Sequence, residues 1–242
     1  MFERVHHQRI ARVLQALDAP GFLARHCLFG GGTAMALRYG EYRESVDIDF
    51  LVSDLAGYRE LRQLLTGTRG LHAMASDPSA FKLAREVRAD QYGIRTLLLV
   101  DEAAIKFEII LEARIQLEPP RDQDRICGVA TITPLDMATS KLLANSDRWA
   151  DDSVFSRDLI DLAMMQPRGK LLQAALQKAS LAYGASVQTD LARAIEVLTR
   201  REGHLERCMQ AMRMTLPKAL LWQRIKALTA RRTSATPAAA TK

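Results

Sequence analysis

Two aspartates separated by one residue, Asp47 and Asp49, are well spaced to bind a cation. Side chains at positions i and i+2 of an extended strand lie on the same face. The two carboxylates should therefore lie together, while Val46, Ile48 and Phe50 face a core. Ionised carboxylates this close repel each other unless a cation lies between them. Mg²⁺ prefers such oxygen ligands and keeps positions open for phosphate oxygens, so the pair predicts a Mg²⁺ site; the alternative is a solvated strand face.

A glycine-rich turn precedes the aspartates. Residues 27–29 form an apolar run that predicts a strand, and residues 33–39 predict a short helix, with Gly31 and Gly32 between them. Backbone N–H groups at a helix start bind anions, and Thr33 could cap the helix and donate its hydroxyl to a phosphate. A tight turn that merely needs glycine is the alternative. The order strand, glycine turn, helix, acidic strand indicates nucleotide chemistry.

This order resembles the nucleotidyltransferase fold of the DNA polymerase beta superfamily. Within it, residues 29–50 resemble the AbiEii/AbiGii toxin family of nucleotidyltransferases, which reads Gly-Gly-Thr/Ser and then Arg-x-Ser-x-Asp-Ile-Asp-Phe. Here the second part reads RESVDIDF over residues 43–50. The family also has a Lys…Arg…Arg-Asp-x-x-Asp-Leu signature, and this chain has Lys141, Arg148 and then RDLIDL over residues 157–162.

The resemblance implies an enzyme dependent on Mg²⁺ or Mn²⁺ that transfers a nucleoside monophosphate from an NTP to an acceptor. It implies the toxin of a type IV toxin–antitoxin or abortive-infection system, with a cognate antitoxin protein as partner. Some relatives modify the 3′ end of tRNA, so tRNA or another RNA is the expected acceptor. It also implies that Lys141 faces the nucleotide and Asp158 helps form the active site, whereas Arg157 and Asp161 are partly structural.

A third metal-binding carboxylate is expected from a later strand, as superfamily members usually have one. Glu108 is the candidate, because it is the only acid inside the apolar run of residues 105–111, where an unpaired carboxylate would be costly to desolvate. An edge-strand residue facing water is the alternative. Glu112 is the second choice, since the period of two places it on the same face. The expected metal ligands are Asp47, Asp49 and Glu108.

Other candidates would bind the nucleotide or act on the acceptor. Ser45 could orient a phosphate or a carboxylate, or cap a turn. Lys141 could neutralise triphosphate oxygens as a point charge, or be an ordinary surface lysine. Asp158 could act as a general base toward the incoming hydroxyl, or form a salt bridge with Lys141 or Arg148. Arg38 could bind phosphate or be solvated. The expected nucleotide-binding residues are Gly31, Gly32, Thr33, Ser45 and Lys141.

Composition narrows the class of protein. A hydrophobic fraction of 48% is typical of a globular protein. No apolar run approaches the roughly 18–20 residues that span a bilayer, and the first residues lack the layout of a secretory signal. The three scattered cysteines form neither a disulfide framework nor a zinc-type spacing. We therefore expect a cytoplasmic protein without a membrane partner.

The net charge of +6 favours a polyanionic partner. Basic residues are concentrated in the last third of the chain, which favours RNA; solvated helix faces are the alternative. Two other readings of the function stay open. The acceptor could be a small molecule or a protein side chain, or the chain could bind a nucleotide or a partner without turnover.

Apolar periodicity predicts the remaining elements. A helix over residues 3–18 should end before Pro20-Gly21, with His6 and His7 on its solvated surface. Strands are expected over residues 95–100, 105–111 and 126–132, the first two as an antiparallel hairpin. Further helices are expected over residues 55–65, 135–145, 155–165, 171–181, 190–200, 205–214 and 220–231.

Together these elements predict an α+β protein. Residues 1–133 should form a nucleotidyltransferase-fold catalytic domain, a mixed sheet with flanking helices. Residues 134–232 should form an α-helical domain that completes the active site and binds the acceptor. The low-complexity tail, residues 233–242, should be disordered.

Overall fold

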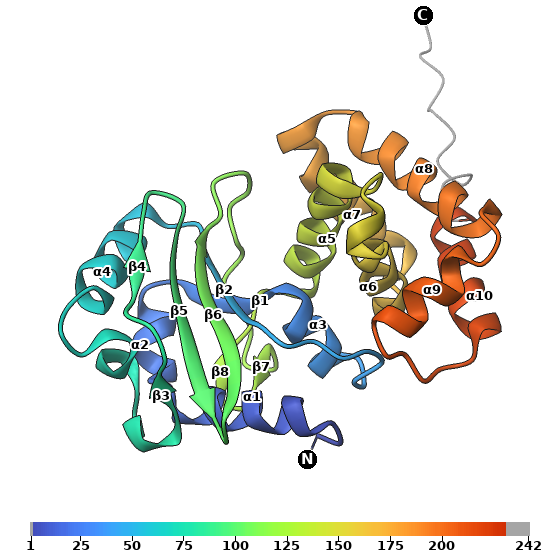
Figure 1. The fold of residues 1–242 in the computed structure, drawn as a ribbon. Coiled ribbons are helices and arrows are strands. Elements are labelled where there is room, and N and C mark those ends of the chain that lie inside the picture. The colour runs from blue at the N-terminus through green and yellow to red at the C-terminus, as the bar shows by residue number, and fades with distance from the viewer. Residues whose placement is uncertain (1, 231–242) are drawn as a thin grey trace, which may run out of the picture. The chain divides into compact units, whose positions relative to one another are not determined.

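The computed structural model of the protein describes residues 2–230. The chain folds into two compact units, Met1–Ser140 and Lys141–Lys242, and the boundary falls inside helix α5 (Pro134–Arg148). Among the described residues, every strand belongs to the first unit, and the second unit contains only helices (Figure 1). The predicted α+β class is confirmed. The predicted tail lies outside the described residues.

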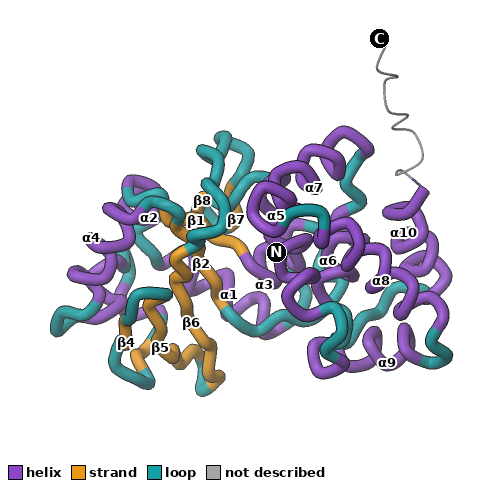
Figure 2. The backbone as a smooth tube through the Cα atoms, turned by 90° about the horizontal axis from the view of Figure 1, so that it is seen from above, coloured by secondary structure: helices purple, strands orange, loops and turns teal. Residues whose placement is uncertain are grey.

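The first unit is built on a sheet that is mixed, as predicted, and has six strands. Its strand order is β1-β2-β6-β5-β3, and β4 also pairs with β5. β2 and β6 run parallel, side by side in Figure 2, whereas the other neighbouring strands are antiparallel. The strands are β1 (Cys27–Gly30), β2 (Ile48–Val52), β3 (Lys82–Leu83), β4 (Arg88–Ala89), β5 (Gly93–Val100) and β6 (Ala103–Leu111).

The two predicted hairpin strands are confirmed as β5 and β6. Asp101 and Glu102 both have positive φ, 46° and 62°, which matches the twist that a two-residue hairpin turn requires. The single strand expected over residues 126–132 is wrong. Cys127 and Gly128 also have positive φ and reverse the chain, so β7 (Arg125–Ile126) and β8 (Val129–Ala130) form a separate two-stranded sheet.

Four α-helices accompany the sheet: α1 (Val5–Ala16), α2 (Ala19–Ala24), α3 (Gly31–Arg38) and α4 (Leu55–Leu65). α1 and α4 confirm two predicted helices. Pro20-Gly21 does not simply end α1, because the proline lies in the first turn of α2, where its missing N–H costs no helical hydrogen bond. The Asp54 side chain caps α4 by accepting hydrogen bonds from the Ala56 and Gly57 N–H groups.

An aromatic core lies beneath the acidic strand. The ring of Phe50, on β2, lies 4.7 Å from that of Phe22, 5.6 Å from Phe29 and 5.5 Å from Phe107 between centroids. These rings fix the face of β2 opposite to Asp49, as the alternation of the sequence predicts. The expectation for Val46 is wrong, since it precedes the strand and is 46% exposed.

The second unit completes α5 and contains five more α-helices: α6 (Arg157–Met165), α7 (Gly169–Tyr183), α8 (Ser186–Arg200), α9 (His204–Ala211) and α10 (Lys218–Ala230). All six helices expected after Pro134 are confirmed, and their bounds differ from the prediction by a few residues. α10 packs against α6 and α8, and α7 packs against α8. Within residues 2–230, no helix has the length and apolar character that a membrane span requires.

Candidate active site

One row of the sheet brings the acidic and glycine motifs together. Gly30 on β1 pairs with Asp49 on β2, Asp49 pairs with Glu108 on β6, and Glu108 pairs with Arg95 on β5. Adjacent strands are about 4.8 Å apart, and paired residues lie on the same face. The sheet thus places Asp49 beside the end of the glycine turn and beside the candidate third carboxylate.

Two side chains of the acidic segment, residues 43–49, lie against the glycine turn. Gly31 has φ of +67°, and a Cβ atom there would lie 2.4 Å from Oδ2 of Asp49. A Cβ atom at Gly32 would lie 2.4 Å from Nη2 of Arg43. Glycine is required at position 31, where φ is positive and a side chain would also meet the Cβ atom of Asp49 at 2.8 Å, whereas a side chain at position 32 would displace the end of the flexible Arg43. Both charged groups therefore lie against the first turn of α3.

Thr33 links the helix to the acidic segment. Its hydroxyl lies 2.8 Å from the Ser45 hydroxyl and also hydrogen-bonds to the Asp47 carbonyl. The expectation that Thr33 caps the helix is wrong, because α3 begins at Gly31 and Gly30 occupies the cap position. Thr33 is buried. Its hydroxyl thus holds the chain that carries the aspartates, and the binding of a phosphate by Thr33 stays a prediction.

Asp47 and Asp49 fit a divalent cation. Asp47 immediately precedes β2, and Asp49 lies within it; both are half-buried. Within residues 2–230, the carboxylate of Asp47 has no hydrogen-bonding or ionic partner. The Asp49 carboxylate lies in the space that a side chain at Gly31 would fill. Mg²⁺ is commonly held by one or two carboxylates together with substrate phosphates, so these two ligands are sufficient.

The expected third carboxylate is engaged elsewhere. Glu108 Oε1 lies 2.8 Å from Arg95 Nε, and its Oε2 lies 2.6 Å from Lys106 Nζ. The second choice, Glu112, is buried and paired with Arg114 at 2.7 Å. Among the described residues, no three His, Cys, Asp or Glu side chains are grouped to hold a metal. Metal binding by Glu108 stays a prediction, and it would require two ion pairs to open.

The second unit contains a network of four charged groups, of which three are buried and Arg148 is 34% exposed. Lys141 Nζ lies 3.1 Å from Asp158 Oδ1 and 2.6 Å from Asp161 Oδ2. Arg148 donates to both oxygens of Asp158, at 2.6 and 3.0 Å. α5 provides both cations, and α6 provides both acids one turn apart on one face. Two positive charges thus neutralise two negative charges in one network.

This network favours a salt-bridge role for Asp158. Burial acts to raise the pKa of Asp158, but Lys141 and the hydrogen bond from Arg148 outweigh it, so the pKa lies below its ordinary value. A carboxylate held ionised in this way is a weak proton acceptor. Lys141 is not an ordinary surface lysine, since it is only 7% exposed. The salt-bridge alternative is therefore shown, and the general-base role stays a prediction.

The structure changes the predictions for two polar residues of the first unit, Arg38 and His7. Arg38 is neither free for phosphate nor simply solvated, because it donates to Asp124 at 2.7 Å and to Thr131 at 3.1 Å. The assignment of His7 to a solvated surface is wrong, because its side chain is fully buried. His7 precedes Ile10 by three residues, and that helical spacing could have placed it on the buried face of α1.

His7 connects α1 to the acidic segment. Its Nδ1 atom lies 2.7 Å from Glu41 Oε1, and its Nε2 atom accepts the Ser45 N–H at 3.1 Å. His6 Nε2 lies 3.0 Å from the Val46 carbonyl. Burial lowers the pKa of His7, and the hydrogen bond to Glu41 only partly offsets this effect. The structure therefore holds a neutral imidazole at this position.

The stability of the protein should fall as the pH drops below about 6.5, the ordinary pKa of histidine. Unfolded His7 binds a proton at a higher pH than folded His7, so acid favours the unfolded state. His204, whose burial also lowers its pKa, contributes in the same direction. Urea unfolding at several pH values between 7.5 and 5 measures this slope. His7→Asn should flatten it, and an equal slope in both proteins would contradict the assignment.

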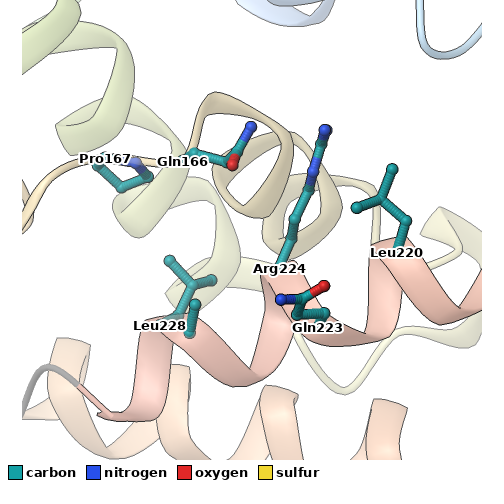
Figure 3. A pocket seen from close by; sticks show the side chains of 7 residues that line it. Gln166, Pro167, Leu220, Gln223, Arg224 and Leu228 are labelled. Carbon is teal, nitrogen blue, oxygen red and sulfur yellow. The ribbon is translucent and has the colours of Figure 1, made fainter.

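Two cavities lie outside the candidate site. In the second unit, a cavity of about 170 Å³ lies beside α10, and Figure 3 shows Arg224, Gln223 and Leu228 around it. In the first unit, a cavity of about 270 Å³ is lined in part by Asp54 and Glu118. Neither is lined by the candidate residues, so neither bears on the chemistry proposed for them.

Comparisons with known proteins identify one family. The family described as nucleotidyl transferase AbiEii toxin, type IV TA system, matches residues 12–237. A Helicobacter pylori protein provisionally named a nucleotidyltransferase is 16% identical over 92% of this chain and 96% of its own, with a TM-score of 0.44. JHP933 from Helicobacter pylori is 15% identical over 93% of this chain and 94% of its own, with the same TM-score. The search of curated proteins found no match.

Proposed function

The chain belongs to the AbiEii family of nucleotidyl transferase toxins of type IV toxin–antitoxin systems, and from this premise we propose its reaction. The protein transfers a nucleoside monophosphate from an NTP to the 3′ end of tRNA or another RNA, in the cytoplasm and with Mg²⁺ or Mn²⁺. A cognate antitoxin protein restrains it, and its release serves abortive infection against phage. The observation that supports the reaction best is the position of Asp49 and Arg43 against the two glycines that begin α3.

In this proposal the first turn of α3 and Arg43 bind the triphosphate. The first N–H groups of a helix have no partner within it and attract anions. The Arg43 guanidinium adds a positive charge beside Gly32. Asp47 and Asp49 would hold the cation. When bound, the cation would neutralise phosphate oxygens and promote deprotonation of the attacking hydroxyl.

Lys141 is proposed to neutralise triphosphate oxygens as a point charge. An ammonium group has three donors, and Asp158 and Asp161 each accept a contact from it. Asp158 and Asp161 would then position Lys141, because their contacts restrict its long and flexible side chain. Asp158 would act through Lys141 and would not itself take a proton.

Charge supports RNA as the acceptor. Residues 141–242 contain 17 Lys and Arg against 9 Asp and Glu, whereas residues 1–140 contain 17 against 19. The excess positive charge thus belongs to the second unit, although some of these residues form ion pairs there, such as Arg201 with Asp152. Binding of a polyanion weakens steeply as salt rises. Transfer to tRNA should therefore lose affinity between 50 and 200 mM salt, about tenfold or more.

The acceptor is tested by measuring KM for tRNA across that salt range with the NTP saturating. A KM for tRNA that does not change with salt would contradict the proposed electrostatic binding. Label recovered on a small molecule or on a protein would retain the chemistry and replace the acceptor. Binding of NTP without any transfer would favour the alternative that the chain binds a nucleotide or a partner and catalyses no reaction.

Gly31→Ala should lose most of the activity, because the new Cβ atom must displace the Asp49 carboxylate. Gly40→Ala is the matched control: Gly40 also has positive φ, +87°, but a Cβ atom there meets nothing within 4 Å. Each substitution adds backbone strain of about 1–2 kcal/mol. Transfer assays and urea unfolding of both variants separate this strain from the displacement. Equal activity in the two variants would show that the position of Asp49 beside the turn does not matter.

A further inference from the structure

The segment that carries Asp47 is held by hydrogen bonds from outside the sheet. Residues 41–47 belong to the connection between α3 and β2 and have no regular secondary structure, so their backbone groups need other partners. Two residues of α1 supply them: His7 accepts the Ser45 N–H at 3.1 Å, and His6 lies 3.0 Å from the Val46 carbonyl. Because Asp47 precedes the first residue of β2, strand pairing alone does not fix it.

The contacts of His7 define its tautomer. The Ser45 N–H can only donate, so Nε2 of His7 carries no proton, and the proton lies on Nδ1. Nδ1–H donates to Glu41 at 2.7 Å. The Glu41 carboxylate also accepts the backbone N–H groups of Glu3 and Arg4, at 2.7 and 3.2 Å. Glu41 is thus fixed at the start of α1, and it orients the ring toward Ser45.

The chain of contacts continues to the aspartate. The Ser45 hydroxyl lies 2.8 Å from that of Thr33, and Thr33 also hydrogen-bonds to the Asp47 carbonyl. We propose that His7 is a positioning residue for nucleotidyl transfer: with Glu41 as its orienting partner, it fixes Ser45 and thereby the position of the Asp47 carboxylate. The inference rests on the proposed function only for its effect on catalysis.

Protonation of His7 would break its hydrogen bond with Ser45. A proton on Nε2 leaves His7 without an acceptor for the Ser45 N–H and places two donors against each other. The charged groups that face His7 are Glu41, Arg4 and His6. Glu41 favours the proton, whereas burial, Arg4 and His6 oppose it. Acid should therefore loosen residues 44–47.

Two substitutions separate the two bonds of His7. The amide of Asn reaches the position of Nδ1, so His7→Asn keeps the bond to Glu41 and loses the acceptor for Ser45. The longer Gln reaches the position of Nε2, so His7→Gln can restore that acceptor. His72→Asn is the control: His72 belongs to the same unit, stacks on Phe81 and bonds to its carbonyl, but does not contact the acidic segment.

Hydrogen exchange of the backbone amides measures how firmly His7 holds residues 44–47, and it does not depend on enzyme activity. His7→Asn should speed exchange over residues 44–47 about tenfold, the effect of losing one buried hydrogen bond, while exchange in β6 changes less. His7→Gln should restore part of the protection, and His72→Asn should leave this segment as in the wild type. Long-range ¹H–¹⁵N NMR spectra should show His7 protonated on Nδ1. Equal exchange over residues 44–47 in wild type and His7→Asn would overturn the proposal, as would equal loss in His7→Asn and His7→Gln.

Enzyme kinetics test whether the positioning by His7 affects nucleotidyl transfer. His7→Asn should lower kcat by about 10- to 100-fold, as the loss of an outer-shell partner does at metal sites, with a smaller change in KM for the NTP. His7→Gln should recover part of the rate. If exchange responds as expected but the wild type transfers no nucleotide, the proposed function fails and the positioning of the segment stands. If kcat is unchanged in His7→Asn although exchange is faster, the role in catalysis is contradicted.

Discussion

Asp49→Asn is expected to lower nucleotidyl transfer by more than about 100-fold, the upper range for loss of an outer-shell partner at a metal site. The amide keeps the size of the carboxylate but removes its negative charge, so it fits beside Gly31 and binds a divalent cation poorly. The rings of Phe50 and its neighbours lie on the opposite face of β2 and are untouched. The free energy of unfolding should therefore change by less than about 1 kcal/mol.

Transfer assays and urea unfolding measure the two effects of this substitution separately. Asp122→Asn is the matched control, because it makes the same chemical change at an exposed position of the same unit and should leave both quantities unaltered. An Asp49→Asn protein that is folded and fully active would refute the assignment of Asp49 as a metal ligand.

Lys141→Met is expected to destabilise the second unit by about 3–5 kcal/mol, the usual cost of removing one member of a buried ion pair. Lys141 contacts Asp158 and Asp161, which are 3% and 0% exposed. Without Lys141, the four-charge network loses one of its two cations, and the pKa of Asp158 should rise because the attraction that lowers it is weakened. Activity should fall as well, if Lys141 binds the triphosphate.

The stability of this variant is measured by urea unfolding. Lys170→Met removes an exposed lysine at the start of α7 and is the matched control. A Lys141→Met/Asp161→Asn double variant should recover part of the loss, because it removes one charge of each sign. If Lys141→Met unfolds within about 1 kcal/mol of the wild type, the network does not stabilise the unit as described.

The regular elements near the site could be predicted because local patterns determine them. The alternation around Asp49 identified the buried face of β2, and the hairpin over residues 95–111 followed from two apolar runs and a short turn. The wrong predictions concern connections between elements. The exposure of Val46 depends on how the segment before β2 runs, which no local pattern contains. The burial of His7 could have been inferred from its helical spacing to Ile10, but its contacts with Glu41 and Ser45 could not.

In the candidate site, too, features set by neighbouring residues could be predicted, and contacts between distant elements could not. The motifs indicated the glycine turn and the aspartates directly, because their chemistry lies in neighbouring residues. The pairing of Glu108 with Arg95 was not predictable from spacing, since it depends on the pairing of β5 with β6, whereas Lys106 lies on the same face of the same strand by the period of two. The contact of Arg43 with the turn likewise depends on the path of residues 41–47, although the sequence placed this arginine beside the acidic strand.

The most direct test of the central claim is incubation of the purified protein with Mg²⁺, each labelled NTP in turn and total tRNA. An Asp47→Ala/Asp49→Ala double variant runs in parallel. We predict that at least one labelled nucleotide is transferred to tRNA by the wild type and not by the double variant. Transfer that persists in the folded double variant would contradict the claim that these two carboxylates carry the reaction.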